Sequence, residues 1–261
     1  MLHRYRRAHH RRADGYVRWT LLICVLGILS TERVNAQAGP AASSGRPLQE
    51  DEVIQRIDAA VKQRTDRVAS YTVQELYSIY RNGEASPSAQ VTVRTMYRRA
   101  VGKEYTPVSA TGSSFLRSVV LDRILANEKE MAKAANRESV ALTSANYKMN
   151  LEPGHAAING RDCVIVDLKA RRKAHFLING RGWFDSSDFT LVHLEGSPAQ
   201  SVSIFARDMA GNRDYTRIDG FSMAQHAEIH THNFLFGDTL MKIDYTGYQI
   251  QLEPKASPSA E

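Results

Sequence analysis

Hydrophobic positions change their spacing along the chain, and the spacing predicts helix first and strand afterwards. Residues 48–68 carry an apolar side chain every three or four positions, in a stripe that ends at Val68, and acidic residues crowd the first turn. This pattern predicts an amphipathic helix, because acids interact favourably with the dipole at a helix N-terminus. Residues 71–83 and 89–99 alternate between apolar and polar, which predicts two strands. Their apolar faces carry Tyr71, Val73, Tyr77 and Ile79, and then Val91, Val93, Thr95 and Tyr97.

A second helical pattern covers residues 113–139. Its first half is densely apolar at helical spacing, and its second half is polar and rich in alanine. An apolar run this continuous exceeds the single stripe that a surface helix needs to face a core. The first half is therefore predicted to be buried, either as plain core or as one wall of a ligand cavity.

Short apolar runs separated by turn signals fill the chain from Tyr147 onward. The turn signals are Asn-Gly at 159 and again at 179, Ala-Gly-Asn at 210 and Asp-Gly at 219. Regular short strands with close turns predict an antiparallel meander. About ten strands with only two helical regions make an α+β fold, a large curved antiparallel sheet with the helices covering one face. Separate strands are predicted for residues 174–180 and 182–188, and for residues 200–208 and 214–220.

The two ends of the chain differ from the middle. Residues 1–36 combine a basic start, a short apolar run and a small-residue site at Val34–Ala36, which predicts a secretory signal peptide cleaved after Ala36. The apolar run is shorter than the roughly 20 residues of a transmembrane helix, and an uncleaved anchor is the alternative. Residues 37–47 and 253–261 predict a disordered leader and tail. Residues 48–252 then form a single domain.

Charge and cysteine content depend on this cleavage. The whole chain has 34 Lys and Arg against 28 Asp and Glu. Seven of the bases and two of the acids lie in residues 1–36, so 27 and 26 remain in a nearly neutral mature chain. Nothing in this balance predicts nucleic-acid binding, which requires a basic surface on the folded domain. Of the two cysteines only Cys163 remains, so the mature chain forms no internal disulfide.

Histidines gather between Ala224 and Gly237. On a strand His226, Glu228, His230 and His232 share one face, because alternate side chains point the same way. Two histidines two positions apart on a strand are able to chelate zinc, which makes a metal site one interpretation. The sequence lacks the HExxH spacing of metalloproteases, since Glu228 comes one position too late. The other interpretation is a solvated strand face, with the intervening apolar residues packed inward.

Four stretches of the second half carry a family resemblance. They are INGRDCVIVDLKARRK (158–173), GRGWFDSSDFTLVHLEGSPAQS (180–201), YTRIDGFSMAQHAEIHT (215–231) and LFGDTLMKIDYTGYQ (235–249). In these the chain resembles the LolA/LolB-like, outer-membrane lipoprotein-sorting-like family of exported bacterial proteins. It departs from the family pattern before His226, where it reads FSMAQH in place of an aromatic residue and a proline. The resemblance implies an incomplete antiparallel barrel plugged by helices, with an apolar cavity between them.

The resemblance also implies a function. It leads us to expect a periplasmic carrier- or sensor-like protein that binds a lipid or lipoprotein acyl chain in the concave sheet. Envelope proteins are further expected partners, and no enzymatic activity, cofactor or nucleic acid is expected. The candidate ligand-binding residues are Phe115, Leu116, Val119, Val120, Ile124 and Trp183. Two alternatives stay open: a metal-dependent envelope enzyme that uses His226, His230 and His232, and a protein-interaction module of the envelope-stress regulator type.

Overall fold

The computed structural model describes three ranges of the chain, residues 49–201, 206–233 and 237–254. The predicted signal peptide, the predicted leader and most of the predicted tail lie outside these ranges, so the predictions made for them stay predictions. Within the described ranges, no helix is long and apolar enough to cross a membrane.

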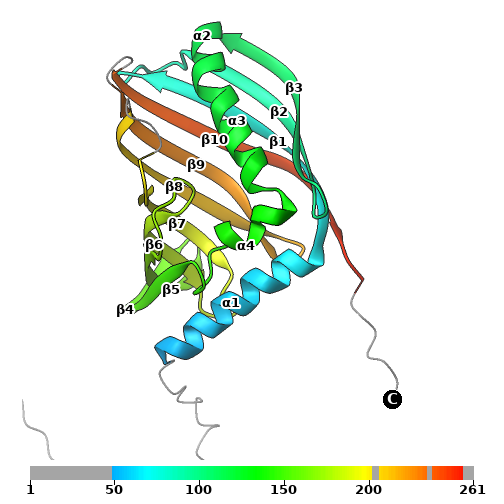
Figure 1. Ribbon diagram of the computed structural model, residues 1–261, viewed down its shortest axis with the longest axis vertical. Coiled ribbons are helices and arrows are strands. Elements are labelled where there is room, and N and C mark those ends of the chain that lie inside the picture. Colours follow the sequence, from blue (N-terminus) through cyan, green and yellow to red (C-terminus); the bar gives the residue numbers. More distant parts are fainter. Residues whose placement is uncertain (1–48, 202–205, 234–236, 255–261) are drawn as a thin grey trace, which may run out of the picture. The chain divides into compact units, whose positions relative to one another are not determined.

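Ten strands of the described residues form one antiparallel sheet (Figure 1). Their order across the sheet is β3-β2-β1-β10-β9-β8-β7-β6-β5-β4, so the first strand pairs with the last and the sheet stays open between β3 and β4. This confirms the predicted α+β fold with a curved, incomplete barrel. The strands are β1 Val68–Arg81, β2 Ala89–Arg98, β3 Gly102–Gly112, β4 Tyr147–Ile158, β5 Arg161–Ala170, β6 Ile178–Asp185, β7 Leu191–Pro198, β8 Ala206–Ile218, β9 Phe221–Asn233 and β10 Gly237–Leu252.

Helices lie against the sheet in two places. Helix α1 (Glu50–Arg67) has the predicted acidic first turn, and it runs along one end of the sheet in Figure 1. The second helical region is broken into short pieces, of which α3 lies across the strands (Figure 1). The Ser113 hydroxyl accepts a hydrogen bond from the backbone N–H of Leu116 and so caps the start of this helical region. The pieces are α2 Ser114–Leu116, a π-helical turn Arg117–Leu121, α3 Asp122–Met131, a 3₁₀ turn Ala134–Asn136 and α4 Arg137–Val140.

Two apolar clusters hold these helices to the sheet. Leu116 and Leu121 are buried against the inner faces of β1, β2, β9 and β10. Val53 and Ile57 of α1 are fully buried against β4, β5 and β6. Burial of one such side chain contributes about 1.5–3 kcal/mol. Both helical regions therefore cover the sheet, as the sequence predicts, and each packs on a different set of strands.

Two of the predicted turns are wrong, and glycines explain why. Asn159-Gly160 and Asp219-Gly220 are turns with positive φ at both residues. Asn179-Gly180 instead lies inside β6, which merges the two strands predicted between residues 174 and 188, and Ala210-Gly211-Asn212 lies inside β8.

Gly180, Gly196 and Gly211 are direct neighbours on β6, β7 and β8. A Cβ on Gly196 would lie 2.5 Å from the carbonyl oxygen of Asn179, and a Cβ on Gly180 would meet the carbonyl oxygen of Glu195 even more closely. These glycines permit a close approach of backbones rather than a turn.

Two further boundaries differ from the prediction. Val68, predicted as the end of the helical stripe, has extended backbone and begins β1, because the chain passes from helix to strand without a loop. Strand β3 was missed altogether. It lies at the edge of the sheet and contains Pro107, and most of its residues are exposed, so it lacks the alternation that marks a half-buried strand.

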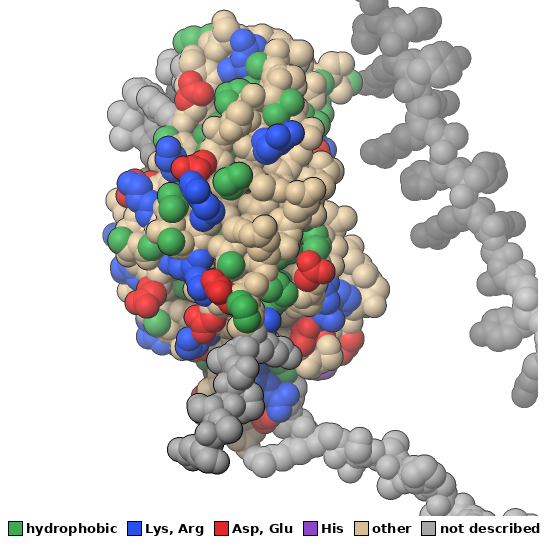
Figure 2. All heavy atoms as spheres, turned by 90° about the vertical axis from the view of Figure 1, so that its right-hand side faces the viewer, with side chains coloured by type: hydrophobic (Ala, Val, Ile, Leu, Met, Phe, Trp, Pro, Cys, Tyr) green, Lys and Arg blue, Asp and Glu red, His purple; other side chains and the backbone are tan. Residues whose placement is uncertain are grey.

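On the face shown in Figure 2, basic and acidic side chains are interspersed among uncharged and hydrophobic ones. Exposed ion pairs elsewhere follow the same pattern, such as Arg98 with Glu104 at 2.8 Å on β2 and β3. Pairs of this kind contribute at most about 1 kcal/mol each, so they do not determine the fold.

Candidate ligand cavity

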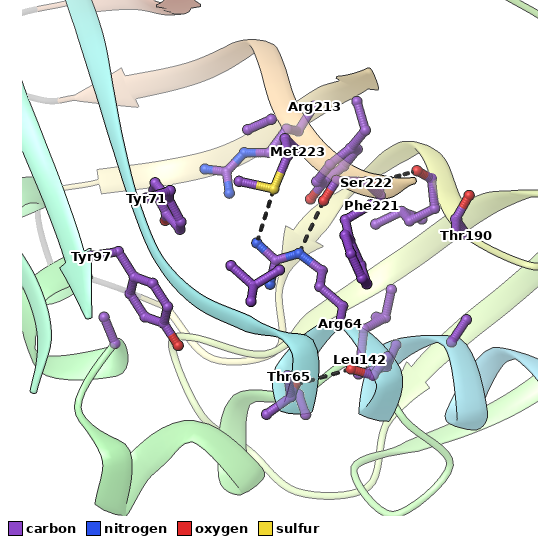
Figure 3. A pocket seen from close by; sticks show the side chains of 18 of the residues that line it. Arg64, Thr65, Tyr71, Tyr97, Leu142, Thr190, Arg213, Phe221, Ser222 and Met223 are labelled. Carbon is purple, nitrogen blue, oxygen red and sulfur yellow. Dashed lines mark hydrogen bonds between the residues drawn. The ribbon is translucent and has the colours of Figure 1, made fainter. Parts of the chain in front are cut away.

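A cavity of about 420 Å³ lies between α1, the α3–α4 segment and the inner face of the sheet (Figure 3). Its volume falls in the range of about 300–1,000 Å³ that is typical of small-molecule sites. Most of its wall is apolar or aromatic, with a small number of charged groups, which is also typical of such sites. Aliphatic and aromatic lining residues include Val61, Met131, Leu142, Leu191, Phe221 and Met223.

Tyrosines form a continuous aromatic part of the wall. The rings of Tyr71 and Tyr97 stack at 4.9 Å with an interplanar angle of 21°, and Tyr248 packs against Tyr71 at 5.8 Å. The hydroxyl of Tyr248 donates to the carbonyl oxygen of Ala224 at 2.9 Å. Burial raises the pKa of Tyr71 and of Tyr248, so both phenols stay protonated and neutral. An aromatic surface results, which suits the apolar part of a ligand.

A buried ion cluster forms another part of the wall. Lys103 Nζ of β3 lies 2.6 Å from Glu128 Oε2 of α3, and the hydroxyl of Tyr105 donates to the same oxygen at 3.0 Å. Arg213 Nη2 of β8 lies 3.6 Å from the other oxygen of Glu128. The cluster thus connects α3 to both β3 and β8.

Both members of the central pair are ionised. Burial alone raises the pKa of Glu128, but the charges of Lys103 and Arg213 and the hydrogen bonds from Lys103 and Tyr105 outweigh it and lower the pKa to about 2. Burial lowers the pKa of Lys103, and the charge of Glu128 reverses this and raises it well above its usual range. A lysine held protonated in this way is not available as a nucleophile or base. The arrangement suits binding rather than proton transfer.

Glu75 of β1 contributes an unsatisfied acceptor to the cavity. Glu75 is fully buried, and the hydroxyl of Tyr77 donates a hydrogen bond to its Oε2 at 2.5 Å. Oε1 lies 4.0 Å from Lys103 Nζ and accepts no hydrogen bond from the described residues. Such an oxygen costs about 1–3 kcal/mol in folding unless a donor reaches it. Glu75 shares the inward face of Tyr71, Val73, Tyr77 and Ile79, and an acid within that apolar face was the sequence signal that we missed.

Arg64 brings a further cation to the cavity from the last turns of α1. Its Nε donates to the carbonyl oxygen of Ser222 at 3.0 Å, and Nη2 lies 3.8 Å from the sulfur of Met223 (Figure 3). Within the described residues no carboxylate forms an ion pair with Arg64. Arg64 is not part of the apolar stripe of residues 48–68, so the hydrophobic pattern gave no signal for it.

Four of the six candidate ligand-binding residues lie outside the cavity. Leu116 is buried, Ile124 packs against the same apolar cluster, and Phe115 is 57% exposed. Trp183 lies half-buried on β6, with its ring 5.0 Å from that of His193. None of these four lines the 420 Å³ cavity. The side chains of Val119 and Val120 lie outside what the structure describes, so their role as ligand contacts stays a prediction.

The histidine stretch is a strand, β9, and its alternation is as predicted. Ala227 is buried, while His226, Glu228, His230 and His232 share the opposite face. His226 Nδ1 lies 2.6 Å from Asp244, and His232 Nδ1 lies 2.7 Å from Asp238.

Glu228 joins these histidines to the neighbouring strand. Its carboxylate lies 2.8 Å from Lys242 on β10 and 3.4 Å from His226 Nε2. No three histidine, cysteine or acidic side chains of the described residues are grouped as a metal site. The stretch therefore presents a polar strand face with histidine–carboxylate contacts and one cross-strand ion pair, between Glu228 and Lys242.

This chain matches known proteins in the comparison of structures. No protein-family model and no curated protein matches the chain. A LolA superfamily protein from Nitrosomonas europaea is 11% identical, with a TM-score of 0.39 over 79% of this chain and 96% of its own. A putative outer membrane lipoprotein-sorting protein domain from Vibrio parahaemolyticus is 11% identical, with a TM-score of 0.40 over 77% and 93%. A DUF1329 family protein from Desulfovibrio piger is 12% identical, with a TM-score of 0.38 over 76% and 92%.

These values are too low to carry any argument about activity. The structures found include members of the superfamily that the sequence stretches resemble.

Proposed function

We propose that this chain is an exported carrier- or sensor-like protein of the cell envelope that binds an apolar ligand in the cavity under its curved sheet. The observation that carries the proposal is the 420 Å³ cavity, with its tyrosine stack and aliphatic wall. Burial of an acyl chain there would contribute about 0.8 kcal/mol for each methylene group. The periplasmic location rests on residues 1–36, which lie outside the described part of the chain.

Two adjacent alanines of α1 offer a matched test. Ala60 lines the cavity, whereas Ala59 is exposed and does not. Ala60→Trp fills cavity volume, and Ala59→Trp adds the same side chain outside it. We expect the fluorescent neutral dye N-phenyl-1-naphthylamine to bind the unaltered protein and Ala59→Trp equally. It should bind Ala60→Trp at least about tenfold more weakly, a loss of about 1.4 kcal/mol.

The natural ligand is sought by solvent extraction and mass spectrometry of protein purified from its own envelope. A co-purifying lipid supports the proposal, and a co-purifying peptide would favour the interaction-module alternative. Absence of dye binding by the unaltered protein, together with no extracted lipid, would contradict the carrier function.

A further inference from the structure

The cavity carries an excess of positive charge. Two carboxylates and four cationic side chains line it, which leaves two formal positive charges. A cavity that accepted only hydrocarbon would gain nothing from such charges, because removing them from water is costly unless they are paired. The charged lining residues are Glu75, Glu128, Arg64, Lys103, Arg137 and Arg213.

Pairing within the cavity is uneven. Lys103 lies 2.6 Å from Glu128 and 4.0 Å from Glu75, so these three groups form one compact set. The shortest distance between Arg213 and Glu128 is 3.6 Å, which is longer than a good hydrogen bond. Arg64 donates to a backbone carbonyl and not to a carboxylate of the described residues. Two guanidinium groups thus keep N–H donors that the described carboxylates do not use.

Figure 3 shows Arg64 reaching from α1 and Arg213 from the sheet toward the space beside Met223. Tyr71 borders the same space, and its ring continues the aromatic wall through Tyr97 and Tyr248. Cationic donors therefore adjoin an apolar surface. Such a junction fits a ligand with one charged end and one apolar end.

We infer that the ligand is an amphiphile with an anionic head group, bound between the guanidinium groups of Arg64 and Arg213, with its chain against the tyrosine wall. This inference rests on the proposed function and specifies the class of its ligand. The planar fork of an arginine matches carboxylate and phosphate oxygens, and such charge-assisted hydrogen bonds are about twice as strong as neutral ones.

Three amphiphiles with the same twelve-carbon chain test the head group separately from the chain. They are dodecanoate, 1-dodecanol and dodecyltrimethylammonium, each measured below its micelle concentration near neutral pH by displacement of N-phenyl-1-naphthylamine. We expect dodecanoate to bind about tenfold or more tightly than either of the others, as one charge-assisted hydrogen bond suffices for this ratio. Equal binding of all three would overturn the inference and leave the proposed function standing. Binding of none would overturn both.

Charge-removing variants locate the head group. Arg64→Gln and Arg213→Gln should each weaken dodecanoate binding about tenfold and leave 1-dodecanol binding within about twofold. Arg94→Gln is the matched control, because Arg94 is exposed on β2 and does not line the cavity. A dodecanoate preference that survives both variants would overturn the assignment to Arg64 and Arg213. The head-group series on the unaltered protein tests the inference even where a variant fails to fold.

Discussion

Acid should lower the free energy of unfolding of this protein, partly because it protonates one buried carboxylate, that of Glu128. Its pKa is about 2 in the folded protein, against 4.5 without the fold, so the ionised form is stabilised by the native neighbours. A depressed carboxyl pKa contributes stability above the unfolded value, and this contribution is lost as the pH falls through the folded value. With 1.36 kcal/mol for each pKa unit, the contribution at pH 7 is on the order of 3 kcal/mol. On the order of 2 kcal/mol of it disappears between pH 7 and pH 3.

The assay is urea unfolding at several pH values between 7 and 3, for the unaltered protein and for Glu128→Gln. Because glutamine does not titrate in this range, the variant should lose about 2 kcal/mol less stability than the unaltered protein over the interval. Glu104→Gln is the control, since Glu104 is 47% exposed in its pair with Arg98 and should leave the pH dependence nearly unchanged. Parallel pH profiles for Glu128→Gln and the unaltered protein would refute the assigned role of Glu128.

Three further outcomes are expected. Gly180→Ala should lower the free energy of unfolding by more than about 2 kcal/mol, because a Cβ there meets the backbone of β7. Gly160→Ala has open space around it and should lower that free energy by about 1 kcal/mol. Equal losses in thermal unfolding would contradict the backbone contact at Gly180. Zinc should not raise the melting temperature, and His230→Ala with His232→Ala should change it little; a specific site would add about 2.7 kcal/mol at a hundredfold excess over its dissociation constant. The mature N-terminus should be Gln37, which N-terminal sequencing of the envelope protein checks and which retention of residues 1–30 would disprove.

Local pattern predicted the antiparallel sheet but missed its edge strand β3, and it was misleading where β6 and β7 approach each other closely. Asn159-Gly160 and Asn179-Gly180 are the same dipeptide, yet only the first is a turn. The difference depends on Gly196, the residue opposite Gly180 on the neighbouring strand, whose backbone leaves no room for a Cβ. Single-sequence patterns contain no information about which strand lies opposite.

The candidate site was harder to predict for a related reason. The inward direction of Tyr71 follows from alternation alone. The ion cluster does not, because Lys103 belongs to a strand that the pattern missed and Glu128 lies in the polar, alanine-rich half of the second helical pattern. Arg213 joins them from a position 85 residues further along the chain. Only the sheet order brings these charges together.

The pairing of the first strand with the last has a consequence for how the chain folds. Ser70 of β1 pairs with Gln251 of β10, 181 positions away, so this part of the sheet requires closure of nearly the whole domain. Contacts of such long sequence separation slow folding, because the entropy of loop closure opposes them before they add stability.

The strands β1–β3 are made early, and one edge of β1 has no strand partner until β10 follows. Tyr245 and Tyr248 arrive with β10, so the cavity is among the last features to form. A chain shortened before Gly237 lacks both tyrosines and the β10 wall of the cavity.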